Sequence, residues 1–148
     1  MRFPAGVEAV HAFGSTLSFV LEGADTAGTL AVALNVTPPG GGPPLHRHVA
    51  EDELFLVLDG QLEFLVAGEW CAVPPGGIVY YPRGVPHAFR NVGDVPSRHW
   101  VLVTPAGFEH FMADCAPLFI GPGPVDRERV GAIAKRHGIE VLGPPPRG

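Results

Sequence analysis

The sequence predicts an all-β domain, a sandwich or barrel of antiparallel strands with a short helical segment at its C-terminal end. Turn signals recur at intervals of roughly eight to twelve residues, and apolar residues alternate with a period of two between them. The 20 glycines and 17 prolines suit many tight turns. With 148 residues, of which 46% are hydrophobic, the chain is long enough for one domain with a substantial core.

The strand predictions begin with two short pieces in residues 7–21. A third strand is expected in residues 28–37, where Leu30, Val32, Leu34 and Val36 share one face. The stretch "PPGGGPP" that follows neither matches a phosphate-binding glycine pattern nor leads into a helix, so we interpret it as a loop.

A hairpin is predicted at the Asp59-Gly60 pair, because these residues favour the positive φ angles of tight turns and stand between two apolar runs. Further short strands are expected in "IVYYP", "VPHAFRNV" and "SRHWVLVT". They complete a predicted barrel over residues 1–104.

Helical spacing replaces the alternation after Thr104, over residues 106–116 and 126–138. Asp126 is a suitable N-cap and Gly138 suits the position after the second helix. The final "GPPPRG" is expected to be a loose tail. Residues 105–148 are therefore predicted to be a helical extension packed on the barrel. Whether it covers the barrel as a lid or only adds to its core is left open.

The composition argues against several classes of partner. A formal charge of −5 gives no reason to expect nucleic acid or a membrane surface, and no signal peptide or membrane-spanning run is visible. Cys71 and Cys115 are far apart and are interpreted as free thiols of a cytoplasmic protein, with one disulfide left open as an alternative.

The candidate functional side chains are concentrated in the stretch "LHRHVAEDELFLVLDG". Residues i and i+2 of a strand share a face, so His46 and His48 would project together into the barrel. If Glu53 also faces inward, so do Phe55 and Val57, while the leucines between them face outward. Glu51 and Asp52 are interpreted as solvated loop charges.

Two longer patterns contain these residues. Residues 40–60 read G-x5-H-x-H-x4-E-x6-G, and residues 76–91 read G-x5-P-x-G-x2-H-x3-N, with His87 as the histidine of the second pattern. Together they resemble the two signature motifs of the cupin superfamily at every defining position, and the gap of residues 61–75 is similar to that of small single-domain cupins.

The resemblance implies a jelly-roll barrel with one divalent metal ion held by His46, His48, Glu53 and His87. Iron, manganese, nickel, copper, cobalt and zinc all accept such nitrogen and oxygen ligands, and an octahedral ion would keep two positions open. A metal-free barrel with a hydrogen-bonded polar cluster is the alternative. Small cupins are commonly homodimers, so a homodimer is expected.

Other residues have weaker claims to a function. Phe55, Phe89 and Tyr81 are the candidate substrate-binding residues, and Tyr80 would then pack elsewhere. Asn91 is interpreted as a turn residue. The four remaining histidines, which have no motif partner, are expected to be surface or packing residues: His11, His99, His110 and His137.

Three functions remain open. The stretch "VLVTPAGFEHF" and the segment after it resemble quercetinase-like cupins, which implies a dioxygenase for a small aromatic or enolisable substrate, with O₂ as cosubstrate and Glu53 as general base. The second function is a non-redox isomerase, cyclase or decarboxylase, assisted by Tyr80 or Tyr81. The third is a non-catalytic module that binds a small molecule.

Overall fold

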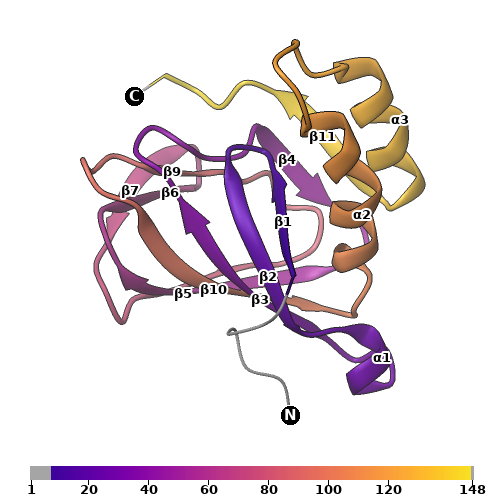
Figure 1. The fold of residues 1–148 in the computed structure, drawn as a ribbon. Coiled ribbons are helices and arrows are strands. Elements are labelled where there is room, and N and C mark those ends of the chain that lie inside the picture. The colour runs from indigo at the N-terminus through magenta and orange to yellow at the C-terminus, as the bar shows by residue number, and fades with distance from the viewer. Residues whose placement is uncertain (1–7, 148) are drawn as a thin grey trace.

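The computed structural model describes residues 8–147 as a β-barrel flanked by C-terminal helices (Figure 1). Its strands in chain order are β1 (Ala9–Ala12), β2 (Ser15–Leu21), β3 (Ala31–Thr37), β4 (Leu45–His48), β5 (Asp52–Asp59), β6 (Leu62–Val66), β7 (Glu69–Val73), β8 (Ile78–Tyr81), β9 (Phe89–Asn91), β10 (Ser97–Thr104) and β11 (Ile139–Gly143). The helices are α1 (Gly23–Thr26), α2 (Phe108–Cys115), the 3₁₀ helix η1 (Ala116–Phe119) and α3 (Arg127–Arg136).

The strands form three antiparallel sheets. The largest has the order β1-β2-β3-β10-β5-β8, a second has the order β7-β6-β9, and β11 pairs with β4. Strands distant in sequence are neighbours, as β3, β10 and β5 illustrate, which is consistent with the predicted jelly roll. The all-β prediction is confirmed.

The predicted hairpin at Asp59-Gly60 is wrong. Strand β5 pairs with β10 and β8, whereas β6 pairs with β7 and β9, so the turn carries the chain from one sheet to another. Gly60 has a φ of +88°, and a Cβ at this position would collide with Ser97. The glycine is therefore needed for the close approach at this crossing. The hairpin forms instead between β6 and β7, through Ala67 and Gly68, both with positive φ.

Alternation within the strands sets what faces the barrel interior. On β5, Phe55 and Val57 are buried as predicted. On β3, the larger apolar side chains are only half-buried, and the interior face carries Ala31, Ala33, Asn35 and Thr37. Ala31 and Ala33 pack in a core cluster with Phe111 and Met112, whereas Asn35 lines a cavity inside the barrel.

The C-terminal segment contains the two predicted helices, close to their predicted bounds. The side chain of Asp126 accepts a hydrogen bond from the Arg129 amide, and Gly138 has a φ of +68°, as the capping pattern predicts. Strand β11 was not predicted, and it pairs with the strand that carries His46 and His48. The tail is also less loose than expected, since the Trp70 indole donates a hydrogen bond to the Pro146 carbonyl.

Both cysteines are free, with Cys71 exposed and Cys115 buried, so the alternative of a disulfide is excluded. Within residues 8–147, none of the helices has the length and apolar character needed to span a membrane.

Candidate metal centre

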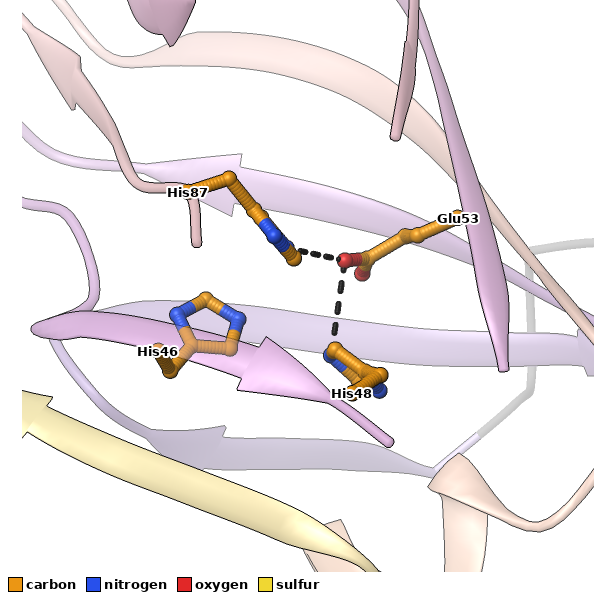
Figure 2. A group of neighbouring side chains, drawn as sticks. All are labelled: His46, His48, Glu53 and His87. Carbon is orange, nitrogen blue, oxygen red and sulfur yellow. Dashed lines mark hydrogen bonds and ion pairs between the residues drawn. The ribbon is translucent and has the colours of Figure 1, made fainter. Parts of the chain in front are cut away.

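Four side chains from three places in the chain converge inside the barrel (Figure 2). His46 and His48 lie on β4 and share a face, Glu53 is the second residue of β5, and His87 lies two residues before β9. Their candidate ligand atoms all lie within 4.8 Å of one another. His48, Glu53 and His87 are almost completely buried. The structure thus brings together all four residues that the sequence singled out.

Backbone hydrogen bonds hold the two motifs side by side. The His87 amide donates to the His46 carbonyl at 2.8 Å, and the His46 amide donates to the His87 carbonyl at 3.1 Å. The Gly84 amide donates to the His48 carbonyl at 2.6 Å, from a turn in which Gly84 has a φ of +82°. The spacing between Gly84 and His87 therefore places the third imidazole opposite the first two.

Each of the three imidazoles has an acceptor beside its Nδ1 atom. The acceptors are the Pro44 carbonyl for His46 at 2.9 Å, the Val85 carbonyl for His87 at 2.9 Å, and the Glu51 carboxylate for His48 at 2.6 Å. A carbonyl oxygen only accepts, so Nδ1 carries the hydrogen in His46 and His87, and a neutral ring then has its lone pair on Nε2. Partners of this kind are typical of metal-ligating histidines.

Glu51 was not predicted to belong to the site. Its side chain is only 12% exposed and bonds to His48, so it is not the solvated loop charge that the sequence suggested. The interaction spans three residues across the turn between β4 and β5, and strand alternation does not describe such a turn. Asp52 lies on the opposite face from Glu53, but it is the first residue of β5 and bonds to Arg83, so it is not a loop charge either.

Glu53 faces the Nε2 atoms of two of these histidines. Its Oε2 atom lies 2.6 Å from Nε2 of His87 and 3.4 Å from Nε2 of His48. Nε2 of His48 is buried and has no hydrogen-bond partner. Lone pairs that face a carboxylate need a positive charge between them, either a proton or a metal ion. This orphaned nitrogen is the clearest sign that the residues fit a metal.

The protonation states of Glu53 and His46 agree with this ligand set. Burial would raise the pKa of the Glu53 carboxyl, but His48 and the hydrogen bond with His87 lower it to about 2. Burial, assisted by His87 and His48, lowers the pKa of His46 to about 3. A carboxylate and a neutral imidazole are the forms that bind metal. Although burial opposes it, Glu53 and Glu51 raise the pKa of His48, which shows how strongly the site attracts positive charge.

A cavity of about 60 Å³ adjoins the cluster and is lined largely by apolar side chains. His46 and Glu53 form part of its wall. The C-terminal segment supplies another part, through Phe108, Phe111 and Met112 of α2 and Ile139 and Val141 of β11. The Phe108 ring lies 5.4 Å from that of His48. The C-terminal extension therefore closes one side of the cavity, a role that the sequence left open.

The predicted substrate-binding residues divide into two groups. Phe55 and Phe89 line the cavity, but Tyr81 does not. The Tyr81 hydroxyl donates to the Leu65 carbonyl at 2.9 Å, and its ring stacks on His87 with centroids 4.3 Å apart. Tyr81 therefore supports a candidate metal ligand, and its prediction as a substrate-binding residue is not borne out. Tyr80 is 55% exposed on the outer face of the sheet.

Two further predictions concern polar residues outside the cluster. Asn91 is structural, since its side chain donates to the carbonyls of Thr37 and Val95 and accepts from the Gly93 amide. His99 is a packing residue, fully buried among the rings of Phe55, Phe64 and Phe89.

Comparisons with known proteins agree with this description. Residues 34–105 match the model of the cupin domain. Germin-like protein 1-4 of Oryza sativa subsp. japonica is 33% identical over 108 residues, which cover 64% of this chain and 46% of the relative. Quercetin 2,3-dioxygenase of Bacillus subtilis is 33% identical over 81 residues, which cover 54% of this chain and 24% of the enzyme. The chain thus spans less than half the length of either relative.

Among solved structures, a predicted oxalate decarboxylase of Thermotoga maritima superposes with a TM-score of 0.67. The match covers 71% of this chain and 98% of that one, at 17% sequence identity, and so supports the fold alone. Both signature motifs and the family match agree, and residues 34–105 of this chain are a cupin domain.

Proposed function

We propose that the chain is a metal-dependent oxidoreductase of the dioxygenase type, which acts on a small, largely apolar substrate with an enolic or phenolic oxygen. The observation that carries this proposal is the buried, unpartnered Nε2 atom of His48 beside Glu53, next to an apolar cavity. A divalent transition metal ion held by His46, His48, Glu53 and His87 would supply positive charge for a substrate oxyanion and a redox-active centre for O₂.

The chain's own residues would prepare the substrate. Glu53, the carboxylate of the ligand set, would accept the proton of a substrate hydroxyl whose acidity the metal ion increases. Phe55 and Phe89 would hold the apolar body, while Phe108 and Met112 would keep water away from it. In a dioxygenase reaction both atoms of O₂ enter the organic product, so no external reductant is needed.

The structure gives less support to a non-redox reaction assisted by a tyrosine. Tyr81 is bonded to the Leu65 carbonyl and Tyr80 lies on the outer face, so neither lines the cavity. A decarboxylase or isomerase would have to rely on Glu53 for its proton transfers.

The partner and the location are also proposals. A homodimer through the outer face of the six-stranded sheet is supported by its exposed apolar side chains, with Ile78 63% and Tyr80 55% exposed. A cytoplasmic location is supported by the two free cysteines.

The test is oxygen uptake by protein reconstituted separately with iron, nickel, copper, manganese, cobalt and zinc, in the presence of acetylacetone, catechol or quercetin. We expect uptake with a redox-active metal, incorporation of both atoms of ¹⁸O₂ into the product, and no uptake by His87→Ala. Product that forms equally fast without oxygen would replace the dioxygenase with a non-redox enzyme. Tight binding without product, for every metal and compound, would favour a binding module.

A further inference from the structure

One cavity-lining residue, Asn35, has no part in the metal cluster and carries a polar atom without a hydrogen-bond partner. Four polar side chains line the cavity: Ser15, Asn35, His46 and Glu53. His46 and Glu53 belong to the cluster, and the Ser15 hydroxyl bonds to that of Thr37 at 2.9 Å. The carboxamide oxygen of Asn35 is buried and has no hydrogen-bond partner.

An unpartnered buried acceptor is costly, since it gives up its hydrogen bonds to water without replacement. Asn35 is only 3% exposed and lies on the interior face of β3. An apolar residue of similar size would pack there without this cost. A ligand that donates a hydrogen bond to this oxygen would remove the free-energy cost of the unpartnered acceptor. Ligand binding would therefore explain an asparagine at this position.

The sheet register fixes where Asn35 lies relative to the metal cluster. Strand β10 separates β3 from β5, with His99 opposite Asn35 and Val103 opposite Glu53. The two positions are thus four residues apart along β10, which is roughly 13 Å at the usual rise of a strand. The side chains that line the cavity between them, Phe55 and Val101, are apolar.

The proposed function sets the other end of such a ligand. The cluster of three neutral imidazoles, one carboxylate and a divalent ion carries a charge of +1, and the Glu51 carboxylate behind His48 offsets that charge from outside the cavity. The head group therefore follows from the enolic or phenolic oxygen that would bind the ion, which carries one negative charge once its proton is lost.

We infer that Asn35 is a specificity-determining residue. The substrate is an elongated small molecule with a monoanionic oxygen at the metal cluster and an apolar middle. Its other end carries a hydroxyl or amine that donates a hydrogen bond to the Asn35 oxygen. This inference rests on the proposed function, because it takes the four-residue cluster to hold a metal ion. It narrows the substrate class, since the position of the donor relative to the head becomes a requirement.

The test uses cobalt(II)-loaded protein and two matched series of probes. Hydroxamic acids bind metals as monoanions, and their binding is followed through the cobalt absorption. One series carries a terminal hydroxyl on chains of two to eight carbons, and in the other a methyl group replaces that hydroxyl. We expect the hydroxyl probe to bind about tenfold more tightly than its methyl partner at one chain length, because it satisfies the buried acceptor.

The variant Asn35→Leu should abolish or reverse this preference, while Ser15→Ala, which alters a hydroxyl already bonded to Thr37, should keep it. Asn35→Leu should retain its cobalt and melt at the same or a higher temperature, because it loses an unpartnered acceptor. Asn35→Ala provides the same comparison if leucine does not fit.

The outcomes separate the two proposals. Cobalt bound normally, with the same probe preference in wild type and both Asn35 variants, would overturn this inference and leave the proposed function intact. A wild-type protein that binds no metal would overturn both. A melting temperature several degrees lower in both Asn35 variants, with unchanged probe binding, would mean that the side chain is structural.

Discussion

The barrel buries histidines in two different environments, the metal cluster and the aromatic pocket around His99. Each cluster histidine has an acceptor beside Nδ1, and its other nitrogen is directed toward the cluster. His99 is equally buried, but neither of its nitrogens has a partner, and phenylalanine rings surround it. Burial alone therefore does not identify a ligand. The Nδ1 partner does, because it fixes which nitrogen carries the lone pair.

The largest expected effect comes from removing a cluster histidine. His87→Ala should lower the affinity for a divalent metal by more than about 100-fold, because one of four ligands is lost and Glu53 loses its closest partner. Metal content by plasma mass spectrometry, on protein purified without an affinity metal, measures the change. His99→Leu is the matched control and should retain its metal. Equal metal in His87→Ala and wild type would contradict the assignment.

The second prediction concerns His99 and the dependence of stability on pH. Burial lowers the pKa of His99 to about 4, from an ordinary value of 6.5. Between these values the unfolded chain binds a proton that the folded protein does not, so the free energy of unfolding falls as the pH is lowered from 6.5 to 4. His99 accounts for about 3 kcal/mol of that fall by linkage.

His99→Leu should therefore flatten this dependence, when metal-free wild type and variant are compared by urea unfolding at several pH values. It should also be at least as stable as wild type near pH 7, because it loses two unpartnered nitrogens. Parallel pH profiles for the two proteins would show that His99 finds hydrogen-bond partners in solution.

A smaller effect is expected for the carboxylate beside His48. Glu51→Gln should weaken metal binding by about 10- to 100-fold, because the partner that orients His48 loses its charge. Competition with a chromophoric chelator measures this change. Asp52→Asn is the control, since that carboxylate bonds to Arg83 outside the cluster and its loss should leave the affinity unchanged. Equal affinities for wild type and Glu51→Gln would remove Glu51 from the site.

The smallest effect is predicted for the tyrosine that stacks on His87. Tyr81→Phe keeps the ring contact and removes only the hydrogen bond to the Leu65 carbonyl. The free energy of unfolding should fall by about 1 kcal/mol, with little change in metal affinity. If the variant loses activity while its metal affinity and stability are unchanged, the hydroxyl would have a role in the reaction that this structure does not give it.

The ligand set was predictable from the sequence because two signature motifs contain all four residues. His46 and His48 share a face by strand alternation, and the second motif supplies His87. Features that depend on how strands and turns come together in the folded chain were missed. Strand β11 pairs with β4 only in the folded chain, and Glu51 reaches His48 across a turn. Asp59-Gly60 has the right residues for a hairpin, yet the jelly roll uses them to change sheets.

The orientation of β3 is a second feature that the sequence did not predict. Its larger apolar residues share one face, as the alternation predicts, but the structure places the other face, with two alanines, Asn35 and Thr37, inside. The two alanines pack against Phe111 and Met112 of α2, where a small side chain lets the helix approach the strand, so hydrophobicity alone points to the wrong side. The unpartnered oxygen of Asn35 becomes visible only once this orientation is known.

The most direct test of the central claim is a long-range ¹H–¹⁵N NMR spectrum of the histidine rings, recorded before and after addition of one equivalent of zinc. We expect the Nε2 resonances of His46, His48 and His87 to shift on metal binding while their Nδ1 atoms stay protonated. Both nitrogens of His99 should be unaffected. Zinc binding that leaves the three cluster rings unchanged, or that shifts His99 in their place, would contradict this claim.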